Sequence, residues 1–175
     1  MMDPFSTLGL SLRFDLDVAE LERRYRDLQR ALHPDKHTQA SPSERRATLS
    51  KAVEVNEAYR VLRDDLSRAS ALLAAHGVNV VSESKADPEL LMEVMELREA
   101  LAEARATKND AAVATLAARV KALEDATRRA MIEGFAANDF KKAALSWTRM
   151  RYLRRFVDEV NAIAEEKENA AARGV

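Results

Sequence analysis

Apolar residues in the first part of the chain recur at alternating spacings of three and four, the repeat of a helix with one buried face. The first such set is Val18, Leu21, Tyr25, Leu28 and Leu32. Asp17 stands three positions before Glu20, which is the arrangement of a capping box at a helix start. Because a proline cannot continue a helix, we expect this helix to end at Pro34.

A second helix of the same kind is predicted after a short polar loop, residues 33–40. The run Ser41-Pro42-Ser43-Glu44 offers an N-cap, a proline at the first helical position and a glutamate at the third. The apolar positions that follow are Ala52, Val55, Tyr59, Leu62 and Leu66. The two helices should pack as an antiparallel hairpin. The second pattern continues to a C-terminal cap at Gly77, with a kink expected near Asp64 and Asp65.

The rest of the chain predicts three more helices. Asp87-Pro88 opens the first, and two further helical stretches follow at about 110–133 and 139–168. Helices of this length make a small bundle. With only four glycines and no long run of alternating β-branched residues, the chain is predicted to be all-α. The predicted organisation is a hairpin domain over 1–77, a linker over 78–87 and a three-helix bundle over 88–175.

The composition narrows the classes of function. The 28 Lys and Arg residues nearly cancel the 29 Asp and Glu residues, which argues against a dedicated nucleic-acid binder. Since the chain has no cysteine, it cannot carry a disulfide framework, a Cys-liganded zinc or iron–sulfur cluster, or a thiol nucleophile. The sequence shows neither a membrane-spanning apolar run nor the features of a signal peptide. We therefore expect a cytoplasmic protein without a cofactor or metal of its own, which binds neither membranes nor nucleic acid.

The most specific string in the sequence is His33-Pro34-Asp35, followed by Lys36, in the predicted loop. The simplest interpretation is that the proline ends the helix and the aspartate serves as a turn residue. A metal site built on His33 and His37 lacks a third ligand. General-base catalysis by His33 and Asp35 lacks a nucleophile, an oxyanion hole and a cofactor motif.

The helix before this loop carries a basic stripe. At about 100° per residue, Arg23, Arg26 and Arg30 fall together on the side opposite the apolar positions. Such a stripe is usually an ordinary solvated face, and Asp27 within it dilutes the charge. Alternatively, it is a docking surface for an acidic partner, which would accelerate encounter and weaken with salt.

Three strings taken together resemble the J-domain of DnaJ-class co-chaperones over about residues 3–75. They are Tyr25-Arg26-x-Leu28, His33-Pro34-Asp35-Lys36 and Asn56-Glu57-Ala58-Tyr59-x-x-Leu62. The resemblance implies a helical hairpin that engages a DnaK-type chaperone ATPase and stimulates its ATP hydrolysis, while the co-chaperone itself is not an enzyme. By position, the implied chaperone-binding residues are His33, Pro34, Asp35, Lys36, Arg23, Arg26 and Arg30.

The stretch 89–104 is apolar on two faces. The core stripe in a narrow arc is formed by Leu90, Val94, Leu97 and Leu101. The other side carries Leu91, Met92, Met95, Glu96 and Glu99. Because one core cannot bury both sides, either another element of the chain covers the second side or it is an exposed patch that marks a partner site.

The last predicted helix shows a similar doubling. Its core positions are Trp147, Met150, Leu153, Val157 and Val160. A second side carries Leu145, Tyr152, Phe156 and Ile163, with Arg151 between the two. Arginine and tyrosine are frequent at binding hot spots, although both are also ordinary in a helical bundle.

The string Leu91-Met92-Glu93-x-Met95-Glu96-Leu97-Arg98-Glu99, placed after a J-domain and a linker, resembles the C-terminal domain of the heat shock cognate protein B family. Members of this family are J-type co-chaperones of iron–sulfur cluster assembly. The resemblance covers nearly the whole chain and implies an L-shaped molecule, with the J-domain packed against the bundle. It also implies that the bundle binds the iron–sulfur scaffold protein and delivers it to a dedicated DnaK-type ATPase.

By position, the implied scaffold-binding residues are Leu91, Met92, Met95, Glu96, Glu99, Arg151 and Tyr152. Met95 stands where the family commonly has Leu, and Tyr152 where it commonly has Phe, but both keep an apolar body. We expect a monomer or a weak homodimer.

Three alternatives belong beside this prediction. The first is a J-domain co-chaperone for a different client, with the bundle as a dimerisation or substrate module. The second is a helix-turn-helix-like nucleic-acid binder that uses the basic stripe, which would show a steep salt dependence. The third, a helical hydrolase, lacks a Gly-rich phosphate loop, a supported pair of carboxylates and a nucleophile elbow.

Overall fold

The computed structural model describes residues 3–33, 35, 41–83 and 85–173, and all regular secondary structure in these ranges is helical. The predicted all-α fold class is confirmed. The chain divides into two compact units, unit 1 over Met1–Asn79 and unit 2 over Val80–Val175, and each has its own buried side chains. Within the described ranges, no helix is both long and apolar enough to cross a membrane.

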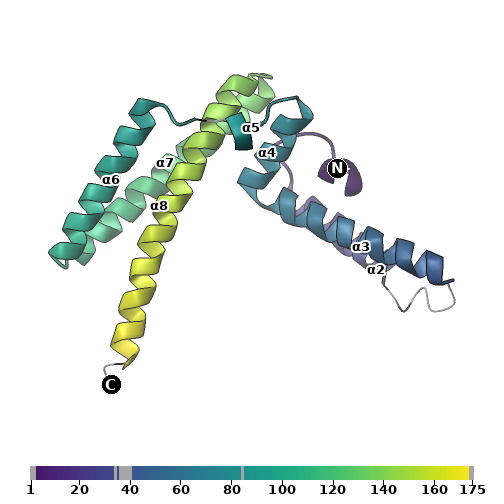
Figure 1. The fold of residues 1–175 in the computed structure, drawn as a ribbon, viewed down its shortest axis with the longest axis horizontal. Helices are drawn as coiled ribbons and strands as arrows, with labels where there is room; N and C mark the ends of the chain where they lie inside the picture. The colour runs from purple at the N-terminus through teal and green to yellow at the C-terminus, as the bar shows by residue number, and fades with distance from the viewer. Residues whose placement is uncertain (1–2, 34, 36–40, 84, 174–175) are drawn as a thin grey trace. The chain divides into compact units, whose positions relative to one another are not determined.

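Unit 1 is built around helices α2 (Val18–Ala31) and α3 (Pro42–Arg63), which run side by side as an antiparallel pair (Figure 1). The short helix α1 (Pro4–Thr7) and helix α4 (Asp65–Ala75) complete it. Its largest fully buried side chains are Phe5, Phe14, Leu21, Val55, Leu62, Leu72 and Leu73. Since both phenylalanines come from the segment before α2, this segment closes a core that the helical pair alone would leave open.

Helix α1 was not predicted from the spacing of apolar residues. A four-residue helix is too short to show a repeat, but it has a start signal. The Asp3 carboxylate accepts hydrogen bonds from the backbone N–H groups of Phe5 and Ser6 at 3.1 and 3.0 Å, and Pro4 occupies the first helical turn.

The predicted kink at Asp64 is wrong, because the chain breaks there into two separate helices. Asp64 has an extended backbone, with φ −89° and ψ 126°, and its carboxylate accepts from Ser67 N at 2.8 Å to start α4. The buried Arg68 holds this corner. Its guanidinium donates to the Leu62 carbonyl at 2.6 Å, pairs with the Asp65 carboxylate and lies 4.9 Å from the ring centre of Phe14. A sharp turn is therefore stabilised from three sides.

The two predicted helix starts differ in how completely they form. Asp17 caps α2 by accepting from Ala19 N at 2.9 Å, but Glu20 does not close the expected capping box. The box at α3 is complete, since Glu44 N donates to Ser41 Oγ at 3.3 Å and Ser41 N donates to Glu44 Oε2 at 2.7 Å. The first turn of α3, which follows the loop, is thus fixed by two reciprocal hydrogen bonds.

The predicted apolar stripe of α2 is buried unevenly. Leu21 is fully buried, while Tyr25, Leu28 and Leu32 are half-buried. Val18 is 55% exposed, contrary to prediction, because it lies in the first turn and at the edge of the stripe.

Unit 2 contains helices α6 (Pro88–Ala106), α7 (Asp110–Ala136) and α8 (Phe140–Arg173), and the predicted helical bundle is confirmed. The central buried cluster draws on all three helices: Leu97, Leu101, Leu116, Val120, Leu153, Phe156 and Val160. Helices α7 and α8 share the most extensive contact. Gly134 permits their close approach, since a Cβ there would lie 2.9 Å from Ala143 N.

The stretch 78–87, predicted as a linker, contains a short helix, α5 (Val80–Glu83). Val80 is buried, and α5 packs against α8 within unit 2. Gly77, at φ +80°, occupies the left-handed region after α4, as expected for the glycine that ends a helix.

The capping box predicts a pH dependence of the α3 start. Hydrogen bonds from the side chain and backbone of Ser41 hold the pKa of Glu44 below its ordinary value of 4.5. A carboxylate whose folded-state pKa is lowered contributes its full stabilisation above the ordinary pKa and loses it as pH falls through the lowered value. We expect the Ser41 amide to be protected from hydrogen exchange above pH 4.5 and to lose protection progressively below it. Glu44→Gln should abolish this response, and an unchanged pH profile in that variant would contradict the assignment.

Candidate functional site

The loop residues that the structure describes are exposed and in contact with each other. His33 follows the end of α2, and Asp35 N donates to His33 Nδ1 at 3.3 Å, while the Asp35 carboxylate lies 3.5 Å from the same nitrogen. Their side chains are 59% and 88% exposed. Pro34 and Lys36, predicted to belong to the same site, lie outside the described residues, as does His37 of the metal alternative.

The basic stripe on α2 is confirmed as a solvent-facing surface. The side chains of Arg23, Arg26 and Arg30 are 69%, 69% and 74% exposed. Each also lies near a carboxylate of the same helix. Arg26 pairs with Glu22 at 2.7 Å, and Arg30 pairs with Asp27 at 2.5 Å. Asp27 therefore reduces the positive charge of the stripe, as predicted, by forming a direct ion pair with Arg30.

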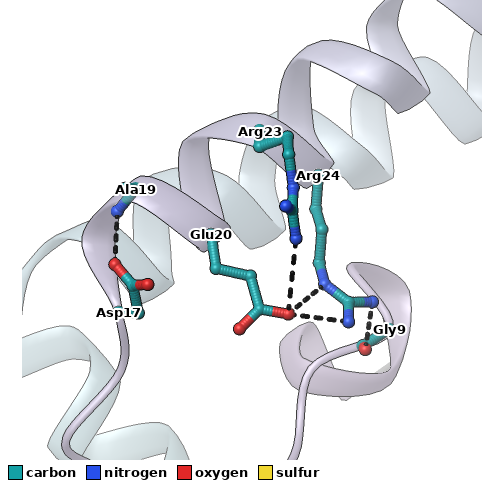
Figure 2. Close-up of polar contacts among 6 residues, drawn as sticks. All are labelled: Gly9, Asp17, Ala19, Glu20, Arg23 and Arg24. Atoms are coloured by element: carbon teal, nitrogen blue, oxygen red, sulfur yellow. Dashed lines mark hydrogen bonds and ion pairs between the residues drawn. The ribbon is translucent and has the colours of Figure 1, made fainter.

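Glu20 connects the basic stripe to the N-terminal segment, as Figure 2 shows. Its Oε1 accepts from Arg24 Nε at 2.9 Å and lies 4.0 Å from the Arg23 guanidinium. Arg24 Nη1 in turn donates to the Gly9 carbonyl at 2.6 Å. Gly9 has φ +64°, and a Cβ there would lie 2.9 Å from Arg24 Nη1. Arg24 is thus an anchor for the segment before α2, which explains why Glu20 does not complete the capping box.

A cluster of polar and aromatic side chains joins α2 to α3 and fixes the two helices relative to each other. The rings of Tyr25 and Tyr59 stack with centres 4.0 Å apart and planes 12° apart. Tyr25 Oη donates to Asn56 Oδ1 at 3.1 Å, and Gln29 Nε2 donates to Tyr25 Oη at 3.3 Å and to Asn56 Oδ1. Tyr25, Asn56 and Tyr59 are motif positions in the sequence. Gln29 was not predicted, and its signal is its place one turn after Tyr25.

Helix α6 resolves the question of its two apolar faces. Its predicted core residues Leu90, Val94, Leu97 and Leu101 are all buried. On the opposite side, Leu91, Met92 and Met95 are 42%, 63% and 60% exposed. Glu96 and Glu99 are exposed beside them. The structure therefore leaves these five predicted residues together on one uncovered helix face.

A surface hollow of about 490 Å³ adjoins this face. It is lined by Glu89, Met92, Glu93, Glu96, Arg119 and Arg149, from all three bundle helices. Glu93 and Arg149 form an ion pair across it at 2.6 Å. Glu93, Arg119 and Arg149 were not predicted as site residues, because their proximity depends on how α7 and α8 pack against α6.

The two predicted residues of α8 have different surroundings. Tyr152 is half-buried. It lies on the same side of α8 as Arg149 and Glu159. Both of these residues form ion pairs with α6, Arg149 with Glu93 at 2.6 Å and Glu159 with Arg98 at 2.6 Å. Arg151 is half-buried, and its guanidinium lies 4.9 Å from the Trp147 ring centre and 5.7 Å from that of Tyr152. Tyr152 thus shares the side of α8 that pairs with α6, and Arg151 lies over the rings of Trp147 and Tyr152.

The predicted second side of the last helix is not a continuous surface. Leu145 is 52% exposed, but Phe156 is fully buried in the central cluster, because α6 covers that side of α8. The side chain of Ile163 lies outside the described residues. The predicted core positions Trp147, Met150, Leu153 and Val160 are buried, and Val157 is half-buried.

Comparison with known proteins assigns both units. Residues 3–70 match the DnaJ domain, and residues 86–161 match the HSCB C-terminal oligomerisation domain. The chaperone HscB from Vibrio cholerae is 31% identical over 94% of this chain and 99% of its own, with a TM-score of 0.83. The chain belongs to the HscB family of J-domain co-chaperones.

Two further HscB-like structures are similar to it. The human co-chaperone HscB is 32% identical, with 94% of this chain and 83% of the human chain covered and a TM-score of 0.84. The Jac1 co-chaperone from Saccharomyces cerevisiae shares the fold at 20% identity, with 87% and 85% coverage and a TM-score of 0.70. Membership of the HscB family supports a chaperone ATPase as one kind of partner.

The exposure of the α6 face predicts a contrast in stability. Leu91→Ala, Met92→Ala and Met95→Ala should each change the free energy of unfolding by less than about 0.5 kcal/mol, because these residues are exposed and lie outside the buried core. Leu97→Ala should cost about 2–5 kcal/mol, because Leu97 is fully buried. Urea unfolding followed by the fluorescence of Trp147, the single tryptophan, reports on unit 2. A large loss for Met95→Ala would show that the face is covered.

Proposed function

We propose that this HscB-family chain is an adaptor with two binding surfaces. Unit 1 binds a DnaK-type chaperone ATPase and stimulates its ATP hydrolysis, and unit 2 binds the iron–sulfur cluster scaffold protein and delivers it to that ATPase. The observation that carries the proposal is the uncovered apolar face of α6, on a helix whose other side is fully used in the core. The adaptor itself is not an enzyme; hydrolysis takes place on the partner.

The surface for the ATPase combines the loop with the basic stripe. His33 and Asp35 are exposed at the end of α2, and Arg23, Arg26 and Arg30 are exposed along it. Exposed cations favour a partner surface rich in carboxylates, and they contribute more to the association rate and the orientation than to the affinity. Pro34 and Lys36 complete the proposed site by their positions in the motif.

The surface for the scaffold is apolar in the middle and acidic at its edge. Burying a Leu or Met side chain contributes about 1.5–3 kcal/mol, so the exposed parts of Leu91, Met92 and Met95 can anchor a complex after the costs of association. Methionine side chains adapt to different partner shapes. Glu96 and Glu99 favour a partner with basic residues around an apolar patch. Tyr152, on the side of α8 that pairs with α6, extends this surface, and Arg151 belongs to it through its stack on Tyr152.

Proximity provides the mechanism. When one chain holds the scaffold protein and the ATPase together, each is present at a high effective concentration for the other. Hydrolysis then coincides with capture of the scaffold and assists transfer of its cluster, which is cargo. The proposal assigns 1–77 to the J-domain, 78–87 to a connecting segment and 88–175 to scaffold binding, in a cytoplasmic monomer or weak homodimer.

The first test is single-turnover ATP hydrolysis by the DnaK-type chaperone of the same organism. We expect this protein to accelerate hydrolysis, and the scaffold protein to increase the acceleration further. His33→Gln should abolish the effect while leaving the helical content unchanged, because the side chain is exposed. Acceleration without any effect of the scaffold would refute the client assignment, and no acceleration would refute the proposal.

The second test addresses the α6 face. The triple change of Leu91, Met92 and Met95 to Ala should weaken scaffold binding by about 100-fold, as expected when about 1 kcal/mol is lost at each side chain. Calorimetry measures the affinity, and stimulation of the ATPase without scaffold should be unchanged. Leu49→Ala is a matched control, because Leu49 is 65% exposed on α3 of unit 1. Equal affinity of the triple variant and the wild type would exclude this face.

A further inference from the structure

Helix α2 carries an unusual balance of charge for a docking surface. It contains four arginines and three carboxylates, so its net charge is only +1. Each of the stripe arginines has a carboxylate one turn away on the same helix. The surface proposed to attract an acidic partner is thus largely neutralised by the chain's own side chains.

The three carboxylates are not equivalent. Glu20 is held by Arg24, which anchors Gly9, and it lies 4.0 Å from Arg23. Glu20 therefore has a structural role, and Arg23 is the least restrained of the stripe cations.

Glu22 and Asp27 have no such role. Among the described residues their ion pairs are with Arg26 at 2.7 Å and Arg30 at 2.5 Å. Glu22 is 37% exposed and Asp27 57% exposed, and the cap of α2 is Asp17. Exposed ion pairs of this spacing contribute little to stability. Their main physical effect is on the field that an approaching partner meets.

We propose that Glu22 and Asp27 attenuate docking of the chaperone ATPase; this inference rests on the proposed function. They reduce the positive field of α2 and occupy Arg26 and Arg30 until the partner's carboxylates replace them. Attenuation disfavours binding to other acidic surfaces, because a partner must supply carboxylates at the positions of both arginines as well as contact the loop.

The test measures association of the full chain with the purified DnaK-type chaperone in its ATP state. Glu22→Gln and Asp27→Asn remove one negative charge each and keep the shape of the side chain. Each should raise the association rate constant about two- to fivefold at about 0.05 M salt, because an opposing charge is removed from the path of the partner. At about 0.5 M salt the gain should disappear through screening.

Asp125→Asn is the matched control for total charge. Asp125 pairs with Lys121 at 2.8 Å on an exposed side of α7 in unit 2, so its removal changes the net charge equally without touching α2. The association rate of this variant should equal that of the wild type. An equal gain in this control, or no gain or a loss in Glu22→Gln and Asp27→Asn, would overturn the inference.

Arg26→Gln separates this inference from the proposed function. If Arg26→Gln slows association but the two carboxylate variants do not accelerate it, the docking surface stands and attenuation is refuted. If Arg26→Gln has no effect either, the docking surface itself is refuted, and the inference with it.

Discussion

The second apolar face of α6 is the constraint from which the organisation of unit 2 follows. Helix α6 has α7 and α8 on one side only, and its stripe from Leu90 to Leu101 fills that side. Leu91, Met92 and Met95 therefore cannot reach the same core without turning the buried stripe into water. Since exposing a fully buried leucine costs about as much as a typical core truncation, the helix has one stable orientation, and that orientation leaves the second face uncovered.

In unit 1 the corresponding constraint is the corner at Asp64. Two helices can meet at a sharp angle only if the backbone groups freed by the break find partners. Asp64 satisfies the start of α4, and Arg68 donates to the Leu62 carbonyl at the end of α3. A buried guanidinium is costly when unpaired, but here it is paired with Asp65 and stacked on Phe14. The N-terminal segment that supplies Phe14 is thereby tied to the corner.

Helical periodicity and capping signals were sufficient to predict the long helices, the outward direction of the basic stripe and the presence of two apolar sides on α6, but not which of its sides is uncovered. They were insufficient where the outcome depends on tertiary contact. Phe156 shares its helix side with Tyr152 in the sequence pattern, but only the position of α6 buries Phe156 and leaves Tyr152 half-buried. The break at Asp64 likewise depends on Arg68, and the pairing of Glu20 with Arg24 depends on the position of Gly9. In each case a residue further along the chain takes part: α6 beside Phe156, the Phe14 ring beside Arg68, and Gly9 beside Arg24.

The two surfaces of the proposed adaptor rely on different physics, and this difference suits their tasks. Contacts between exposed charges form quickly, weaken with salt and are easily exchanged, so the α2 surface is adapted to brief engagement of an ATPase. Apolar burial at Leu91, Met92 and Met95 is insensitive to salt and slower to release, so the α6 surface is adapted to holding a client. A carrier that presents the same client to successive ATPase molecules needs a complex with the client that lasts longer than its complex with the ATPase. The ion pairs of Glu22 and Asp27 act on the α2 surface alone, because they lower the positive field that sets how fast the ATPase docks.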